Sequence, residues 1–325
     1  MTEEFAHKLK YYEQNYFTND EPVPFVGNLK LYPAKVKDYY KFYSLIPVFT
    51  LNKNEDPKGI PMSNLDYVFY KMSQEGEEAE FFARQFIALL EMIFHIKNGR
   101  KCPKCGDFVD FDEINKEIFK FRTEETIILK SNPTEEQIKN LKDRYEVFLE
   151  GLHRCSKCDC EKIDIIRYEE YEENNKKKAI LYIDNIPINR KQFDELRQIV
   201  CYQNILDHDD EYIDPELKAE LEEAARLRNP NAIQPSLEKQ EACILTNSAY
   251  TFETIKEMTI RKMVLLLRTI DAKLHYMAYR QGELSGMVKF NKEIDHWIYS
   301  NNKPNKFDSI VSLDSLKEKI NKANG

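Results

Sequence analysis

Two Cys-x-x-Cys motifs in this sequence of 325 residues have the spacing of metal ligands. Cys102 and Cys105 belong to a Cys-Pro-x-Cys-Gly sequence, and Cys155 and Cys158 form the second motif. A two-residue gap lets both thiolates of one tight turn reach the same metal, and the glycine relieves strain where the chain reverses. Two such turns complete a tetrahedral shell of four sulfurs without an open position. The sequence therefore predicts a structural Zn²⁺ held in a zinc ribbon by these four cysteines.

Two neighbouring residues are alternative ligands. Cys160 adds a third thiol to the second motif, although its one-residue spacing is too short for the usual turn, and His153 precedes the motif by two residues. A redox Cys-x-x-Cys pair requires a helix that begins at the pair, whereas a helix is expected to end upstream at Asn98–Gly99. Cys201 and Cys243 occupy apolar helix positions and are expected in the core.

Other side chains with chemical potential are expected to be structural. Asp271 and His275 are four residues apart on an expected helix, a spacing that suits a base and its orienting group, but no nucleophile motif lies nearby. His296 stands beside Trp297, the only tryptophan, in an expected terminal helix. The acidic run 207–214 lacks the glycine and final glutamate of an EF-hand loop. Phosphate-binding glycine loops, Gly-x-Ser-x-Gly and His-Glu-x-x-His are absent from the sequence, so we predict no enzymatic activity.

Composition narrows the class of protein. The net charge of -8 and the pI near 5.5 argue against a generic nucleic-acid binder, because Lys and Arg are interleaved with Asp and Glu throughout the chain. No stretch approaches the roughly 20 apolar residues of a membrane span, and residues 1–21 lack the apolar segment of a secretory signal. Seven cysteines, four of them in metal-type motifs, favour a reducing compartment.

A zinc-ribbon nucleic-acid-binding or transcription-associated factor is the alternative function. Basic residues cluster around the motifs, with Phe108 and Phe111 close by: Arg100, Lys101, Lys104, Arg154 and Lys157. Acidic residues surround them: Asp107, Asp110, Asp112, Glu113, Asp159 and Glu161. A nucleic-acid surface needs several phosphate contacts, and these acids cancel most of the positive field. Nucleic acid is therefore the less favoured partner.

The elements that must position the motifs are mostly helical. A helix is expected over 77–97, with its stop at Asn98–Gly99. Alternation predicts a strand over 108–111, and Phe119 with Phe121 suggests another. The capping-box sequence at 134–137 predicts a helical insertion that reaches Glu150 and ends at Gly151. Two strands, 162–168 and 179–183, are expected to flank a solvated hairpin tip formed by the charged run 169–178.

The predicted fold is α+β and mostly helical, with a small zinc-ribbon β module that carries a helical insertion between helical regions. Four regions are expected: a mainly helical region at 1–99, the zinc-ribbon module at 100–185, a helical segment with an acidic linker at 186–247, and a helical region at 248–325. Ser63 and Asp66 mark the expected start of a helix, since Ser63 can cap it and the Asp66 carboxylate lies near free backbone amides. Further helices are expected over 189–203, 215–228, 236–247, 259–281 and 292–299. The helix over 259–281 has the most regular apolar stripe.

Two stretches resemble tail proteins of bacterial viruses: 31–40, with Leu-Tyr-Pro and Asp-Tyr-Tyr, and 258–288, which opens on Met-Thr-Ile-Arg. With the first cysteine motif between helical segments, the layout is similar to baseplate hub and tail-assembly proteins of contractile-tailed phages, some of which carry a zinc ribbon. The resemblance covers part of the chain and carries over no catalytic residue. It implies a structural or assembly component whose partners are other tail or baseplate proteins or further copies of itself. It also implies a location in the host cytoplasm during assembly and in the virion tail.

Overall fold

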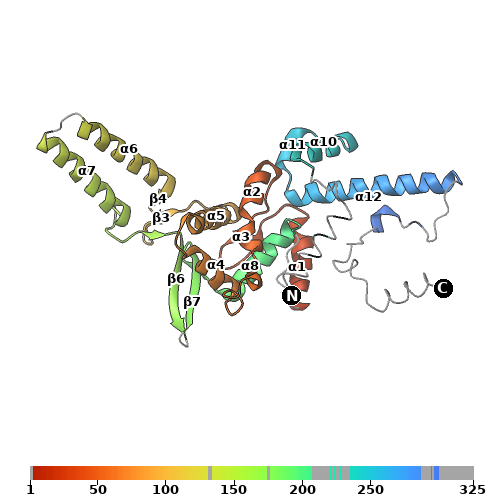
Figure 1. Ribbon diagram of the computed structural model, residues 1–325, viewed down its shortest axis with the longest axis horizontal. Helices are drawn as coiled ribbons and strands as arrows, with labels where there is room; N and C mark the ends of the chain where they lie inside the picture. The colour runs from red at the N-terminus through yellow and green to blue at the C-terminus, as the bar shows by residue number, and fades with distance from the viewer. Residues whose placement is uncertain are drawn as a thin grey trace. The chain divides into compact units, whose positions relative to one another are not determined.

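The computed structural model of this chain describes residues 3–130, 134–173, 176–206 and 235–286, together with 220, 223, 227, 294 and 296–299. The fold is α+β and mostly helical, as predicted, with small antiparallel sheets (Figure 1). By its internal contacts the chain divides into two compact units, one formed by 1–34 and 38–209 and the other by 35–37 and 210–325. Of the expected helix over 215–228 the structure describes residues 220, 223 and 227, which are helical, and the acidic run 207–214 lies outside the described residues.

The N-terminal part of the first unit is built from short helices and one long helix. They are α1 (Glu3–Tyr12) with its π-helical extension η1 (Glu13–Phe17), α2 (Tyr39–Leu45), α3 (Pro47–Thr50), η3 (Lys53–Glu55), α4 (Asn64–Met72) and α5 (Glu77–Phe94). The 3₁₀ turn η2 (Val36–Asp38) precedes α2, and its first two residues belong to the second unit. A two-stranded sheet pairs β1 (Val23–Pro24) with β2 (Lys30–Leu31). The aromatic and aliphatic faces of α4 and α5 are buried against each other and against the helices around them.

A helix from far along the chain completes this core. In α8 (Arg190–Gln203), Phe193 is fully buried, with its ring 5.7 Å from Phe49 and 6.2 Å from Phe86 between centroids. The buried guanidinium of Arg197 donates hydrogen bonds to the carbonyl oxygens of Phe49 (2.7 Å) and Leu51 (3.1 Å). These bonds satisfy polar backbone groups inside an apolar core. The helix after the cysteine motifs is thus part of the same core as the helices before them.

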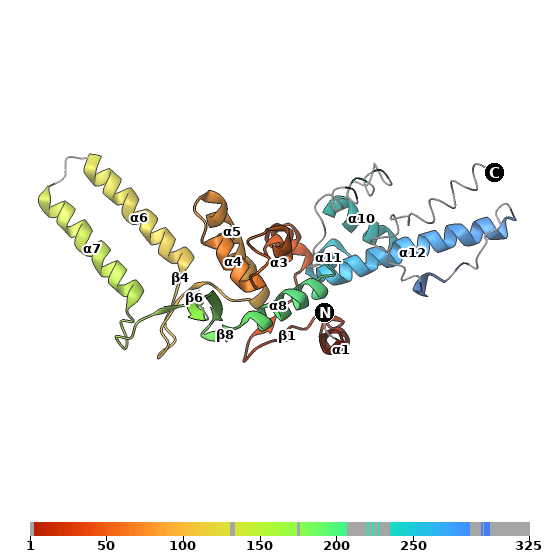
Figure 2. The same cartoon turned by 60° about the horizontal axis from the view of Figure 1, so that its bottom comes forward.

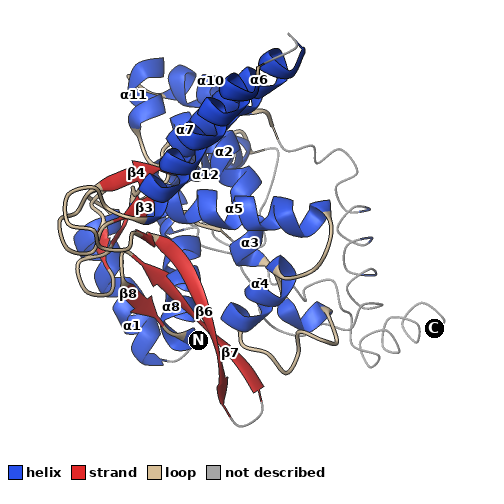
Figure 3. Ribbon diagram, turned by 90° about the vertical axis from the view of Figure 1, so that its left-hand side faces the viewer, coloured by secondary structure: helices blue, strands red, loops and turns tan. Residues whose placement is uncertain are grey.

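One carboxylate links α4 to the following sheet and to α8. Asp66 forms a capping box with Ser63 at the start of α4, as the sequence predicts. Its side chain also accepts a hydrogen bond from the backbone N–H of Ala179 (2.9 Å) and pairs with Arg190 (2.7 Å). Figure 3 shows α4 beside the hairpin that contains Ala179. Because it meets three elements at once, Asp66 fixes their mutual placement.

The hairpin of the first unit is longer than expected. The strands β6 (Ile166–Glu173), β7 (Lys176–Ile183) and β8 (Ile186–Ile188) form an antiparallel sheet in that order. Most of the charged run 169–178, expected as a hairpin tip, lies within β6 and β7. The register places Glu170 opposite Ala179, Tyr171 opposite Lys178 and Glu172 opposite Lys177. Opposite charges at facing positions stabilise a sheet.

The cysteine motifs lie in a second small sheet that carries two long helices. Its strands are β3 (Gly99–Lys101), β4 (Phe108–Asp110) and β5 (Ile163–Asp164), with β3 in the centre. Between β4 and β5 the chain forms α6 (Phe111–Lys130) and α7 (Glu135–His153), which run side by side in Figures 1 and 2. We call this pair of helices the arm. The expected helical insertion is present, and Thr134 starts α7 with the predicted capping box.

The predicted strand at Phe119 and Phe121 is wrong, because both residues lie in α6. The ring of Phe121 packs 5.3 Å from Tyr145 and 5.5 Å from Phe148 of α7, whereas Phe119 is exposed. Ile114 is buried on the same face of α6, and a separation of seven residues from Phe121 fits a helix rather than a strand. A pair of aromatic residues two apart was therefore a misleading signal.

Two predicted helix ends are also wrong. α5 ends at Phe94 because His95 adopts a left-handed conformation (φ 50°), and Gly99 begins the next strand instead of ending the helix. Gly99 is required there by a close approach: a Cβ atom would lie 2.3 Å from the carbonyl oxygen of Val109. α7 continues through Gly151 to His153, two residues beyond the expected stop.

The second unit is helical in its described part. It contains α10 (Leu237–Asn247), α11 (Phe252–Glu257), α12 (Ile260–Leu284) and the 3₁₀ turn η4 (Trp297–Tyr299). Ser236 caps α10 and Thr259 caps α12, each by accepting a backbone hydrogen bond, as expected for these residues. Among the described residues, no helix combines the length and apolar character needed to cross a membrane.

Candidate metal centre

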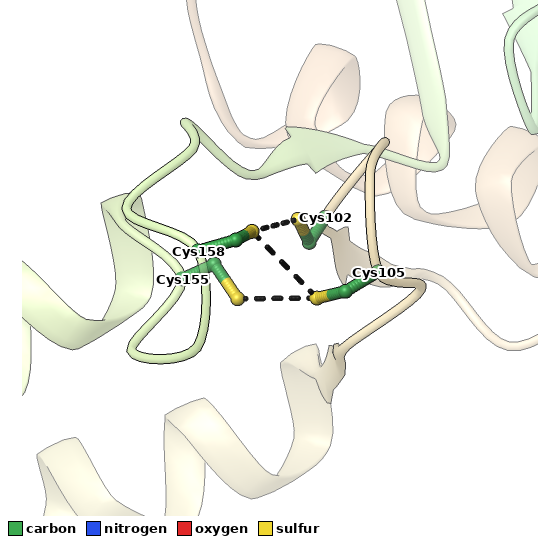
Figure 4. A group of neighbouring side chains, drawn as sticks. All are labelled: Cys102, Cys105, Cys155 and Cys158. Atoms are coloured by element: carbon green, nitrogen blue, oxygen red, sulfur yellow. Dashed lines mark hydrogen bonds between the residues drawn. The ribbon is translucent and has the colours of Figure 1, made fainter.

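The four cysteines lie in two loops, one at the end of strand β3 and the other at the end of helix α7 of the arm. Hook 1 (Cys102–Asp107) connects β3 to β4, and hook 2 (Cys155–Cys160) follows α7 and leads toward β5. Because β3 pairs with both β4 and β5, the sheet brings the two hooks together although they are 50 or more residues apart. Figure 4 shows the four side chains pointing into the space between the hooks.

The two hooks share one backbone conformation. In hook 1 the N–H of Gly106 donates to the carbonyl of Cys102 (3.0 Å), and the N–H of Cys102 donates to the carbonyl of Asp107 (2.8 Å). In hook 2 the N–H of Asp159 donates to the carbonyl of Cys155 (2.8 Å), and the N–H of Cys155 donates to that of Cys160 (2.9 Å). The fifth residue is left-handed in both, with φ 74° at Gly106 and φ 55° at Asp159.

The sulfur atoms are arranged as ligands of one ion would be. Cys102 Sγ lies 3.3 Å from Cys158 Sγ, Cys105 Sγ lies 3.3 Å from Cys155 Sγ and 3.8 Å from Cys158 Sγ, and all four lie within 4.8 Å of one another. A tetrahedral ion with metal–sulfur bonds of 2.3 Å places its ligands about 3.8 Å apart. Cys102 and Cys155 are buried, and all four are free thiols. The donor set fits a metal ion with a closed shell of thiolates.

Hydrogen bonds from the backbone prepare the first cysteine of each hook for metal binding. The backbone N–H of Cys105 lowers the pKa of the Cys102 thiol to about 6. The backbone N–H of Lys157 likewise lowers the pKa of Cys155 below its ordinary value. A thiolate is the form that binds a metal, so the lowered pKa favours the ligand form at both positions.

The second cysteine of each hook has a raised pKa. The backbone N–H of Asp107 acts on Cys105 in the lowering direction, but the facing thiol of Cys155 and burial together raise the pKa. At Cys158 the N–H of Cys160 lowers the pKa, and the facing Cys102 and burial more than reverse this effect. Because these two groups must lose protons when a metal binds, metal binding is pH-dependent.

The two alternative ligands of the sequence analysis are engaged elsewhere. Cys160 occupies the position in hook 2 that Asp107 occupies in hook 1, and its thiol lies 3.5 Å from the carbonyl oxygen of Cys158. His153 is the last residue of α7, and its Nδ1 lies 2.9 Å from Nη1 of Arg100. Neither belongs to the group of converging sulfurs. The structure thus brings together the four cysteines that the spacing predicts.

Acidic side chains pair with the basic residues around the hooks. Asp107 accepts hydrogen bonds from both Lys157 (2.9 Å) and Lys162 (3.1 Å). The remaining pairs are Arg100 with Asp164 (3.0 Å), Lys101 with Asp184 (2.7 Å) and Arg154 with Asp159 (3.1 Å). Each pair offsets a positive charge that a phosphate would otherwise contact. The positive potential around the hooks is therefore weaker than the number of basic residues suggests, and it attracts nucleic acid less.

The other predicted candidates do not form a chemical site. His275 Nε2 lies 3.4 Å from Asp271 Oδ1, but both side chains are largely exposed on α12, as in an ordinary surface pair. The ring of His296 lies 5.0 Å from Tyr276 and 5.4 Å from Trp297. The neighbouring residue 295 lies outside the described residues. Cys201 is buried in α8, as expected for a core residue, whereas Cys243 is half-buried in α10.

Comparison with known proteins adds no relative to this description. No family model matches the chain, and no curated protein and no solved structure matches it. The function must therefore be argued from the molecule itself.

Sequence reasoning missed the part played by Asp107 and Lys162. Lys162 is buried, and its Nζ contacts both Asp107 Oδ2 (3.1 Å) and the carbonyl oxygen of Gly151 (3.2 Å). The signal available was positional, because Asp107 stands one residue after the left-handed turn of hook 1. Nothing local in the sequence shows that a lysine beyond hook 2 reaches it.

Proposed function

We propose that this chain is a non-enzymatic assembly component in which one structural Zn²⁺, bound by Cys102, Cys105, Cys155 and Cys158, holds the base of the arm. The observation that carries the proposal is the convergence of the four sulfur atoms within 4.8 Å. The arm leaves hook 1 through β4 and returns through hook 2. A metal bound at this point joins the two ends of the arm.

The ligand chemistry supports zinc in a structural role. Soft thiolate ligands in a tetrahedral set select Zn²⁺ or iron, and four protein ligands leave no position for a substrate or a reactive water. When bound, the ion supplies a cross-link between hooks that are far apart in the chain. Binding between distant segments stabilises the folded module because it restricts the unfolded chain.

The arm is the surface that this cross-link would present to other proteins. Its two helices pack on each other through Phe121, Tyr145 and Phe148, and Arg144 pairs with Glu124 (2.8 Å). Three further apolar side chains of the arm are exposed: Phe119, Ile127 and Val147. Exposed aromatic and aliphatic groups on a firmly held helical pair suit a protein partner, which would bury them.

The setting we propose is the tail or baseplate of a contractile-tailed phage, with assembly in the host cytoplasm and other tail proteins as partners. The resemblance of 31–40 and 258–288 to phage tail proteins supports this setting, together with the first cysteine motif between helical segments. The competing function is a zinc-ribbon nucleic-acid-binding factor. The ion pairs at Asp107 and around both hooks favour the protein-binding function over it.

Metal analysis of the freshly reduced full chain tests the zinc. We expect about one zinc per chain, as four ligands for one ion require, and no iron. Cys102→Ser is expected to lower the zinc content well below that of the unchanged protein. Cys160→Ser is the matched control, because it removes a nearby thiol outside the converging set, and it is expected to retain the metal. Absence of zinc from reduced protein, or equal loss in both variants, contradicts the proposal.

Co-expression tests the partner. The tagged chain is produced with the products of the genes that neighbour its own, and we expect tail subunits to co-purify with it. Phe119→Asp, which changes an exposed residue of the arm, is expected to weaken this co-purification without releasing zinc. A retardation assay with DNA and RNA over a salt series examines the alternative, since phosphate binding weakens steeply as salt rises. Binding of nucleic acid at physiological salt without any tail partner would overturn the assembly function.

A further inference from the structure

Helix α12 carries a heptad repeat along its whole length. Apolar residues recur at alternating intervals of three and four, with one polar exception at Gln281. In heptad notation the a positions are Ile260, Leu267, Leu274 and Gln281, and the d positions are Met263, Ile270, Met277 and Leu284. A strict interval of 3.5 residues keeps a stripe in contact with another helix wound around the first. A helix that packs on a globular core follows an interval of 3.6 instead.

Within the described part of the second unit, burial of this stripe decreases along α12, and Leu267 and Ile270 are half-buried. Ile260 and Met263 are fully buried, together with Ile244 of α10 and Ile255 of α11. Farther along α12, Leu274 is 51% exposed and Leu284 is 79% exposed. The rest of the stripe, from Leu267 to Leu284, is called the seam below.

In the described segment that follows α12, the ring of His296 packs beside Tyr276 of the helix. η4 contacts α12, and the ring of His296 lies 5.0 Å from that of Tyr276. Tyr276 occupies a c position, two residues after Leu274, and points away from the a and d positions. This ring contact therefore lies off the seam, in which Leu274, Met277 and Leu284 are exposed.

We propose that the seam forms a parallel, in-register coiled coil with the same helix of a second copy of this chain. The polar residue in the seam favours this occupant. In a parallel pair Gln281 meets Gln281 of the second copy, and two amides at the same level can hydrogen-bond to each other. An antiparallel pair that overlaps the whole seam would place Gln281 opposite Ile270, where its amide has no partner.

Charge at the edges of the seam favours the same arrangement. In the parallel register the g residues Lys273 and Arg280 face the e residues Ala278 and Ser285 of the second copy, so no like charges meet. In the antiparallel register Lys273 of each helix would lie beside Arg280 of the other helix. Like charges at these positions oppose pairing. Two identical helices thus fit each other in parallel with the sequence that the chain has.

The test is the mass of the full chain over a concentration series, measured by analytical ultracentrifugation. We expect a dimer whose dissociation constant rises at least about tenfold in Leu274→Asp, because the change places two like charges inside the paired seam. Leu265→Asp is the matched control: it changes an exposed leucine at an f position of the same helix, 43% exposed, and is expected to leave the dimer intact. Circular dichroism checks that both variants stay helical.

A cross-link determines the direction of the helices. In Gln281→Cys the two new thiols meet in a parallel pair, so mild oxidation is expected to give a covalent dimer that the unchanged chain and Leu265→Cys do not give. A chain that remains monomeric up to about 100 µM, or a dimer that Leu274→Asp leaves unchanged, would overturn the proposal. Failure to cross-link through position 281 in a proven dimer would overturn the parallel register. None of these outcomes depends on zinc or on a tail partner.

Discussion

Lys162 and Asp107 join the two hooks through an ion pair that needs no metal. The buried ammonium of Lys162 lies 3.1 Å from Oδ2 of Asp107, and Lys157 of hook 2 reaches Oδ1 at 2.9 Å. Hydrogen bonds from Lys157 and then Lys162 lower the pKa of Asp107 below its ordinary value. The carboxylate at the end of hook 1 thus binds two cations from the segment around hook 2, next to the four sulfurs.

Asp107→Asn is expected to lower the thermal midpoint of the zinc-loaded protein, because it leaves the buried Lys162 ammonium without its anion. Thermal unfolding at pH 7 measures the effect. Asp159→Asn serves as the control, since Asp159 pairs with Arg154 where both side chains are mostly exposed, and such pairs contribute little. Equal midpoints for the two variants would show that the Asp107 pairs have no structural role.

The left-handed position shared by the hooks predicts opposite effects of two substitutions. Gly106→Ala introduces a side chain at φ 74°, which costs about 1–2 kcal/mol. Asp159→Gly removes a side chain from the same position of hook 2, where φ is 55°, and is expected to preserve or slightly raise stability. Chemical unfolding of the zinc-loaded variants gives both values. A larger loss in Asp159→Gly than in Gly106→Ala would contradict the equivalence of the hooks.

Local patterns in the sequence predicted the ligand set and most helices. The spacing within each cysteine motif and the capping box at Thr134 depend on a few neighbouring residues, and the structure contains this capping box. The mostly helical α+β class follows from the same signals. Features that depend on one or two turns of chain can therefore be predicted from the sequence alone.

Features that depend on pairing between distant segments could not be predicted from the sequence. The charged run 169–178 is mostly strand because its backbone pairs in register across β6 and β7. Phe121 belongs to a helix because it packs on Tyr145 and Phe148 of α7. In α12 the spacing of the apolar stripe was visible in the sequence, but only the structure reveals which part of it remains exposed.

An acidic group of the second unit predicts a pH dependence that is independent of the metal. Hydrogen bonds from Lys35 and Lys37, each 2.8 Å from Glu257, lower the pKa of this carboxyl to about 2. The folded pKa is below the unfolded one, so the contribution to stability is present at neutral pH. It is lost as the pH falls from the ordinary pKa of 4.5 toward 2.

Glu257→Gln is therefore expected to lower the thermal midpoint at pH 7 and to make no difference near pH 2. The difference between the two proteins should shrink as pH falls below about 4.5. In a background with Lys35→Gln and Lys37→Gln, the substitution at Glu257 is expected to lose both its effect and its pH dependence. A difference that persists unchanged to pH 2, or survives in that background, would show that the lysines are not its cause.

Removal of the metal is expected to loosen the arm and leave the helical core folded. The hooks close the base of the arm. The core of the first unit depends instead on Phe193, Phe49 and Phe86, which are buried and whose rings pack on one another. Chelation of zinc should raise amide hydrogen exchange in β3, β4, β5, α6 and α7 at least about tenfold. Exchange in α5 and α8 should stay unchanged.

Cys102→Ser should reproduce this pattern without chelator, and Cys160→Ser should not. Uniform loss of protection over the unit would mean that the metal stabilises the whole core, and unchanged protection of the arm would mean that its helices hold together without the hooks.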